Sequence, residues 1–101
     1  MELWKNFDRL VVFDTETTGI EFGRDRIIEI GAVKVIEGKI VDRFSTFVNP
    51  REPIPFEIEQ LTSISDEMVI DAPVIEDILP KFLEFCEGCV LTVSYTHLRA
   101  H

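Results

Sequence analysis

The sequence predicts one mixed α/β domain with three antiparallel strands, a crossover helix, and a fourth strand that returns beside the first and parallel to it. Three observations support this fold class. Apolar, β-branched runs recur three times before Asn49, a helical apolar pattern spans residues 75–86, and a further apolar run begins at Cys89. With 101 residues, of which 46% are hydrophobic and 29% charged, the chain suffices for one globular domain and not for two.

Three strands are predicted in the first half of the chain. Leu10 to Phe13 is apolar on both faces, which is typical of a central strand covered on each side. After a connection from Thr17 to Arg26, Ile27 to Ile36 is rich in β-branched residues. The turn Glu37-Gly38-Lys39 then joins it to a third strand, Ile40 to Val48.

A short and a long helix are predicted in the second half. Pro55 fits the first turn of the short helix, Phe56 to Leu61, where its missing N–H costs nothing. Asp71 or Ala72 is predicted to cap the long helix, and Gly88 to end it. Its apolar face has helical spacing and consists of Ile75, Ile78, Leu79, Phe82, Leu83 and Cys86.

The net charge of −9 argues against a module that binds nucleic acid through a basic face. It remains compatible with a metal-dependent nuclease, because bound cations invert the local field. The N-terminus lacks the pattern of a secretory signal, and no apolar run approaches the roughly 18 residues of a membrane helix. We therefore expect a cytoplasmic protein that does not enter a membrane.

Asp14 and Glu16 stand one residue apart at the end of the first apolar run, in the stretch VVFDTETTG. Residues i and i+2 of a strand project to the same face, roughly 6.5–7 Å apart. Paired carboxylates of this kind suit Mg²⁺ or Mn²⁺ and can hold two ions about 3.5–4 Å apart. The alternative is a polar turn that closes the strand, since Asp, Thr and Gly are common turn residues.

The order and spacing of several motifs resemble the DEDD-type 3′–5′ exonucleases, which include the proofreading subunits and domains of bacterial DNA polymerase III. The motifs are VVFDTETTG, RIIEIGAVKV, a glycine hairpin, FSTFVNP, a PIP segment, LTSIS and a helix begun by DAP. The resemblance covers Arg9 to Leu91 almost continuously. It implies a ribonuclease H-like mixed sheet and a two-metal hydrolase that uses Mg²⁺ or Mn²⁺. The implied substrate is a single-stranded 3′ end of DNA, or of RNA, and a replicative polymerase is an implied partner.

The resemblance also implies roles for individual residues. Asp14 and Glu16 match the metal-binding acids of the first family motif, which are catalytic. Thr17 matches a residue that contacts the terminal nucleotide, largely through its backbone. Glu57 and Thr62 align with positions that line the nucleotide pocket in some relatives.

Other residues carry weaker expectations. Glu29, among apolar neighbours, is expected to be a buried carboxylate that accepts hydrogen bonds from backbone donors. Phe44 and Phe47 are expected in the core, whereas Phe56 can equally stack on a base. Ser63 replaces the glycine usual in the family's LTGI stretch, a small departure that can alter the turn.

The family has four acids and a general base, and its third acid lies just past the fourth strand in a segment resembling VAHNAxFD. Here the chain reads TVSYTHLRAH from Thr92 to His101. A DNA sequence resembling the transposon-end adaptor of sequencing libraries encodes the last nine of these residues. We therefore expect residues 1–91 to be the N-terminal half of an exonuclease domain and 92–101 a translated adaptor. His97 and His101 are then not catalytic, and these 101 residues alone are expected to be inactive.

Three alternatives remain open. The first is a relative that acts on short RNA, which the nucleotide pocket and the missing C-terminal half would distinguish. A haloacid-dehalogenase-like phosphatase reads DxDxT at its strand end, but here Glu16 replaces the second Asp and a hairpin stands where that fold has a helix. A non-catalytic docking module is compatible with the acidic surface and is disfavoured by the intact DTETTG.

Overall fold

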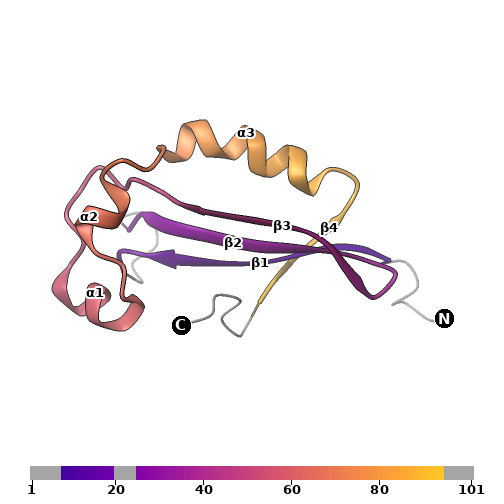
Figure 1. Ribbon diagram of the computed structural model, residues 1–101, viewed down its shortest axis with the longest axis horizontal. Helices are drawn as coiled ribbons and strands as arrows, with labels where there is room; N and C mark the ends of the chain where they lie inside the picture. The colour runs from indigo at the N-terminus through magenta and orange to yellow at the C-terminus, as the bar shows by residue number, and fades with distance from the viewer. Residues whose placement is uncertain (1–7, 20–24, 95–101) are drawn as a thin grey trace.

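The computed structural model describes residues 8–19 and 25–94, and this part of the chain folds into a sheet with one long helix lying along it (Figure 1). The strands are β1 (Arg9–Thr17), β2 (Ile27–Ile36), β3 (Lys39–Phe47) and β4 (Val90–Val93), and the helices are α1 (Phe56–Thr62), α2 (Asp66–Val69) and α3 (Ile75–Cys86). The strand order is β3-β2-β1-β4. The pairs β1–β2 and β2–β3 are antiparallel, and β4 is parallel to β1. The predicted mixed α/β topology is confirmed.

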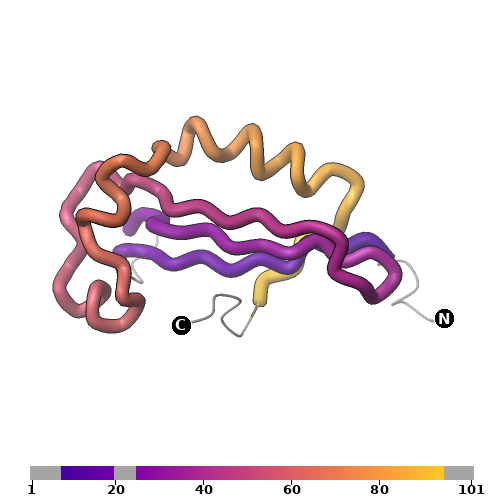
Figure 2. The backbone as a smooth tube through the Cα atoms, in the orientation of Figure 1, coloured from indigo at the N-terminus to yellow at the C-terminus, as the bar shows by residue number. Residues whose placement is uncertain are grey.

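Helix α3 packs along one face of the sheet and forms the main core with it (Figure 2). Side chains alternate between the two faces of a strand, and Val11 and Phe13 of β1 point toward α3. Phe82 of α3 meets Phe13 and Phe44 edge-on, with ring centroids 5.9 and 5.5 Å apart. Such aromatic pairs contribute about 0.5–1.5 kcal/mol beyond the area they bury. The buried members of this core are Val11, Ile30, Ala32, Val48, Ile78, Phe82 and Cys86.

A second, smaller core joins α1 and α2 to the end of the sheet where β1 and β3 end (Figure 1). It depends on a register shift in the first hairpin. Glu16 pairs with Glu29 and Thr17 pairs with Ile27. Ile28 is therefore an extra residue of β2 that is paired with no residue of β1. A bulge of this kind redirects the side chain of the extra residue. Ile28 thereby joins a cluster with Ile54, Ile64 and Val69, against which Phe47 and Ile58 pack.

The first strand is longer than predicted. It ends at Thr17 rather than Phe13, because β2 is long enough to pair along its whole length. Asp14 and Glu16 therefore lie inside a hydrogen-bonded strand, not after one. The alternative reading of DTETTG as only a polar turn is wrong for these two acids.

The second strand has the predicted bounds, and the third lies one residue earlier than predicted at each end. The cause is a tight turn of two residues, Glu37 and Gly38, which lets Lys39 pair with Ile36. Both turn residues have left-handed φ angles, 51° and 80°. This conformation matches the twist of a hairpin, and glycine adopts it without strain.

The helix starts differ from the prediction. Pro55 is the N-cap of α1 and lies before its first turn, and α2 was not predicted. The N-cap of α3 is Val74, not Asp71 or Ala72. Asp71 and Ala72 instead close a turn at the end of α2. A residue that precedes proline, as Ala72 does, is also disfavoured in helical conformation.

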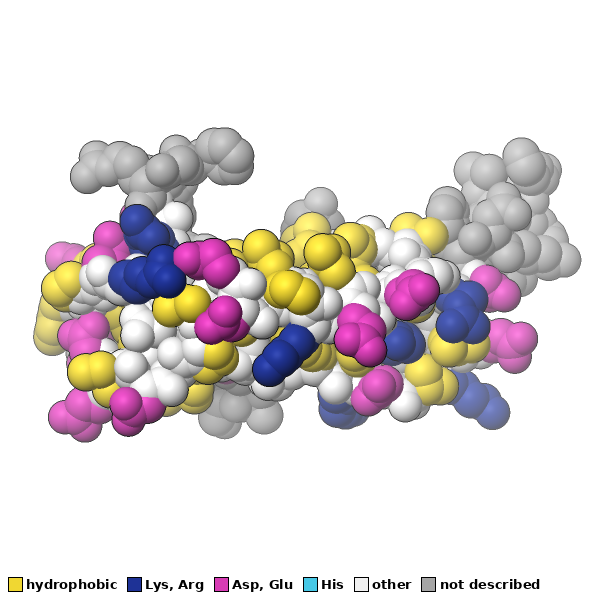
Figure 3. Space-filling model, turned by 90° about the horizontal axis from the view of Figure 1, so that it is seen from above, with side chains coloured by type: hydrophobic (Ala, Val, Ile, Leu, Met, Phe, Trp, Pro, Cys, Tyr) yellow, Lys and Arg dark blue, Asp and Glu magenta, His cyan; other side chains and the backbone are white. Residues whose placement is uncertain are grey.

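The buried face of α3 differs from the predicted apolar face on one side of the helix. Leu79 and Leu83 are 44% and 61% exposed. Phe85, which the prediction omitted, is half-buried against Phe44 with ring centroids 5.5 Å apart, and Lys34 lies 4.6 Å over its ring. Viewed from the α3 side, hydrophobic side chains form a row along the middle of the molecule (Figure 3). Helix α3 thus packs against β1, β2 and β3, and the side of the helix that carries Leu79 and Leu83 is exposed.

Some predicted features lie outside the described residues. These are residues 20–24 of the connection between the first two strands and residues 95–101 of the predicted tail, with His97 and His101. The strand β4 includes Thr92 and Val93, so it extends two residues past the predicted end of the domain at Leu91. Among the described residues, no helix has the length and apolar character needed to cross a membrane.

Candidate functional site

Asp14 and Glu16 project from the face of the sheet that α3 does not cover. Their place in β1 alternates with that of Val11, which is buried under α3. Asp14 pairs with Gly31 of β2, and Glu16 pairs with Glu29. A Cβ built on Gly31 would meet no atom within 4 Å, so the space beside Asp14 is open. The predicted projection of both carboxylates from one face is consistent with this register.

The two acids line an open cavity of about 110 Å³. Glu29, which was expected to be a buried carboxylate, lines it as well. Among the described residues that line the cavity, Arg43 of β3 is the one basic residue. Because acidic side chains outnumber basic ones three to one in this described lining, the cavity favours a bound cation. The described residues of the lining are Asp14, Glu16, Glu29, Gly31, Ala32, Val33, Arg43, Phe44 and Ser45.

The donor set fits a hard divalent cation. Carboxylate oxygens are the ligands that Mg²⁺ and Mn²⁺ prefer. The Oε1 atom of Glu16 is shielded from solvent, and a cation stabilises an ionised oxygen that is held out of water. Within residues 8–19 and 25–94, no group of three or more His, Cys, Asp or Glu side chains is arranged to hold a metal ion. The described residues therefore supply two predicted ligands and not a complete metal centre.

Thr17 ends β1 and begins the turn that follows. Its hydroxyl donates a hydrogen bond to the carbonyl oxygen of Gly19. It pairs with Ile27, which packs against the α3 core. A Cβ at position 19 would lie 2.7 Å from the Oδ2 atom of Asp25, so that carboxylate would have to move to make room for a larger residue. The predicted contact between the Thr17 backbone and a nucleotide stays a prediction.

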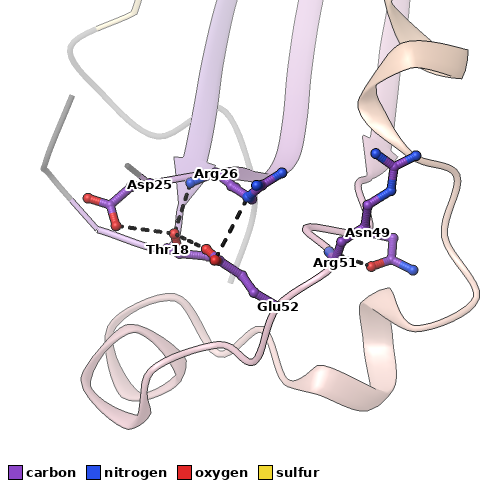
Figure 4. Close-up of polar contacts among 6 residues, drawn as sticks. All are labelled: Thr18, Asp25, Arg26, Asn49, Arg51 and Glu52. Carbon is purple, nitrogen blue, oxygen red and sulfur yellow. Dashed lines mark hydrogen bonds and ion pairs between the residues drawn. The ribbon is translucent and has the colours of Figure 1, made fainter. Parts of the chain in front are cut away.

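Thr18 is a residue of this region that the sequence analysis missed. It is 4% exposed, and its hydroxyl oxygen accepts a hydrogen bond of 2.9 Å from the Arg26 N–H. The same hydroxyl lies 3.4 Å from Asp25 Oδ1 and 3.3 Å from Glu52 Oε1, both acceptors (Figure 4). Glu52 is 34 residues away, and no local spacing rule would have linked the two.

Glu57 and Thr62, the predicted pocket residues, both lie on α1. Glu57 is exposed, whereas Thr62 is only 3% exposed. The Thr62 hydroxyl donates to the Ile58 carbonyl at 2.8 Å and accepts from the Ile64 N–H at 3.2 Å. Ser63, which follows, ends the helix in the left-handed conformation with φ of 63°. The hydroxyl of Thr62 therefore supports the end of α1, and its predicted role toward a nucleotide stays a prediction.

The remaining expectations concern one acid and three aromatic residues. Glu29 is buried as expected, at 9% exposure. Phe44 and Phe47 pack against the two cores, which confirms that expectation. Phe56 is 71% exposed on α1, so its side chain is accessible to a ligand.

Comparison with known proteins places this geometry among nucleases. A model of the exonuclease family matches residues 11–97. The DNA polymerase III PolC-type of Caldanaerobacter subterraneus subsp. tengcongensis is 62% identical over 81 residues, which are 80% of this chain and 6% of that protein. The chain thus spans a small part of the length of the curated relatives that it matches.

Solved structures agree on the fold. A structure of exonuclease X in complex with 5′ overhanging duplex DNA is 42% identical, with a TM-score of 0.65, over 72% of this chain and 42% of that one. A nuclease domain described as a DEDDh family member bound to rAMP has a TM-score of 0.72 at 22% identity, over 86% of this chain and 50% of that one. The second likeness concerns the fold alone, and it agrees with the predicted ribonuclease H-like sheet.

Proposed function

Because this chain belongs to the exonuclease family, we propose that it carries part of a 3′–5′ exonuclease site that removes nucleotides from single-stranded DNA. One observation carries the proposal. Asp14 and Glu16 occupy alternate positions near the end of β1 and line one open cavity on the face that α3 leaves uncovered. Both acids are half-buried, and a bound cation would stabilise their charged forms where water is partly excluded.

Asp14 and Glu16 are the proposed ligands of Mg²⁺ or Mn²⁺, with two ions in a complete site. Bound there, the ions would supply Lewis acidity, lower the pKa of an attacking water and stabilise the leaving oxygen. The backbone at Thr17 is proposed to contact the terminal nucleotide. Glu57 and Phe56 of α1, whose side chains are exposed, are proposed to contact its sugar or base.

We further propose that residues 1–91 form the N-terminal half of the domain and that 92–101 are not native. The described residues provide two of the four family acids at the site, and we identify no general base among them. These 101 residues alone are then expected to bind a divalent cation weakly and to release no nucleotides.

DNA is the proposed substrate, and a replicative polymerase the proposed context. The relative named above is a DNA polymerase III PolC-type protein, and the 42% identical exonuclease X was solved with DNA. RNA is the second candidate, supported by the rAMP bound to a neighbour of the same fold. Magnesium as the ion and a cytoplasmic location stay predictions.

A nuclease assay tests the proposal. A longer product of the same gene should shorten a 5′-labelled single strand from its 3′ end in Mg²⁺ and not in EDTA. Asp14→Asn should lower the rate by at least about 10³-fold, because metal contacts are worth several kcal/mol. Asp42→Asn on exposed β3 is the matched control and should retain the full rate. Full activity of Asp14→Asn would overturn the assignment.

A further inference from the structure

Thr18 fixes the end of β1 to the start of β2 through two hydrogen bonds. Its backbone N–H donates to the Arg26 carbonyl at 2.8 Å, and its hydroxyl oxygen accepts from the Arg26 N–H at 2.9 Å. The hydroxyl has one proton of its own to donate. It can give that proton to Asp25 or to Glu52 at any moment, but not to both.

Glu52 brings a distant segment to the same point. It lies in the connection that leads from β3 to α1, and its other oxygen, Oε2, is 3.8 Å from Nε of Arg26. Further along the same connection, the Ile54 N–H donates to Asp66 Oδ1 at 2.8 Å, which ties it to the start of α2. Figure 4 shows Glu52 reaching from this connection toward Thr18 and Arg26.

The two residues therefore join the metal-binding end of β1 to the segment that enters α1. Glu16 and Thr17 immediately precede Thr18, and Glu57 lies in the first turn of α1, five residues after Glu52. Packing of Ile28 and Ile58 already holds α1 against the sheet. Apolar packing is non-directional, whereas hydrogen bonds are directional and set distance and angle.

We propose that Thr18 and Glu52 are positioning residues for the nucleotide site, which set the placement of α1, and of Glu57, relative to the end of β1. This rests on the proposed function, because the placement of α1 affects binding only if a nucleotide is held between α1 and the end of β1. The bound class is a nucleoside monophosphate or the 3′-terminal nucleotide of a strand. Neither residue touches the reacting atoms.

Thr18→Val tests the proposal, since it keeps the shape of the side chain and removes the hydroxyl. Amide hydrogen exchange at residues 56–62 should rise in this variant, because α1 loses part of its anchor. Binding of thymidine 5′-monophosphate with Mg²⁺, followed by NMR titration, should weaken about tenfold, the size of one hydrogen bond. Thr18→Ser should restore both, and Glu52→Ala should reproduce the Thr18→Val effect.

Thr46→Val is the matched control. Its hydroxyl also bonds within the chain, to the Phe47 carbonyl at 2.8 Å, but it is not bonded to α1 or to the connection that precedes it. Unchanged exchange in α1 of Thr18→Val, relative to this control, would overturn the proposal. So would faster exchange with unchanged nucleotide binding, which marks a purely structural role. The variants are made in the longer product of the same gene. Failure of that unaltered product to bind the nucleotide would instead refute the proposed function, and the positioning role with it.

Discussion

Glu16 of β1 and Glu29 of β2 are directly opposite partners in the antiparallel pair, and both line the same cavity. Directly opposite residues have Cβ atoms about 4.5–5.5 Å apart, and like charges in such pairs destabilise the sheet. We expect opposed carboxylate charges at these two positions to lower the stability of the metal-free chain. A bound divalent cation would reverse that effect, which makes the pair a sensitive reporter of metal binding.

Glu16→Gln is expected to raise the free energy of unfolding in EDTA by about 0.2–1 kcal/mol, because it removes one of the opposed charges. Mg²⁺ should raise the unfolding temperature of the unaltered chain and not that of the variant, since a ligand stabilises only the state that binds it. Thermal unfolding with and without Mg²⁺ measures both. Glu67→Gln on exposed α2 should leave the Mg²⁺ response intact. An equal Mg²⁺ response in Glu16→Gln would contradict the metal assignment.

Ser63→Gly is expected to stabilise the chain. Ser63 holds φ of 63° at the end of α1, a conformation that costs a non-glycine residue about 1–2 kcal/mol. Part of the gain is offset by the greater freedom of glycine in the unfolded chain, so the net effect should be about 0.5–1 kcal/mol. Urea unfolding measures it. Ser45→Gly, at a strand position without positive φ, should destabilise instead. Loss of stability in Ser63→Gly would show that its side chain has a role that outweighs the strain.

Ile64→Ala should lower the free energy of unfolding by about 2–5 kcal/mol. Ile64 is fully buried in the small core that anchors α1 and α2. Leu61→Ala, three residues away and 78% exposed, should change it by less than about 0.5 kcal/mol. Denaturant unfolding of the two variants compares buried and exposed apolar side chains on either side of the same helix end. Similar costs for both would mean that α1 is placed differently from the structure.

The ion pair between Arg51 and Glu76 predicts a local pH dependence. Arg51 Nη1 lies 2.7 Å from Glu76 Oε2, and this hydrogen bond holds the pKa of Glu76 below its ordinary 4.5. An acid whose pKa is lower in the folded than in the unfolded state stabilises the fold at any pH above its unfolded-state pKa. This contribution is lost as the pH falls through the folded-state pKa. Arg51→Ala should move the pKa of Glu76 back up toward 4.5, as NMR titration would report. An unmoved pKa would exclude Arg51 as the cause.

The proposed boundary at Leu91 has a test that needs no protein. Long-read sequencing of the source locus should diverge from this chain at Thr92 or within a residue of it. The native reading frame should continue into a segment that contains an Asn and an Asp. A locus that encodes VSYTHLRAH followed by a stop codon would refute the adaptor interpretation.

The sequence by itself determined the order of the strands and of the two longer helices, the hairpin, and the same-face placement of Asp14 and Glu16. These features follow from local backbone geometry, because a strand repeats every two residues and a two-residue turn needs left-handed φ. The register of β1 against β2 was not accessible in this way. It depends on a bulge at Ile28 that matters only once α1 and α2 pack there.

Only the tertiary structure determined which residues of a local sequence pattern are buried and which are exposed. Helical spacing placed Leu79 and Leu83 on the same predicted apolar face as Ile78 and Phe82. Of these four side chains, only Ile78 and Phe82 are buried against the sheet in the structure. Thr18 and Glu52 meet although 34 residues separate them. Spacing along the chain fixes which side chains share a face, whereas contact between distant segments depends on how those faces pack, and packing is a property of the whole fold.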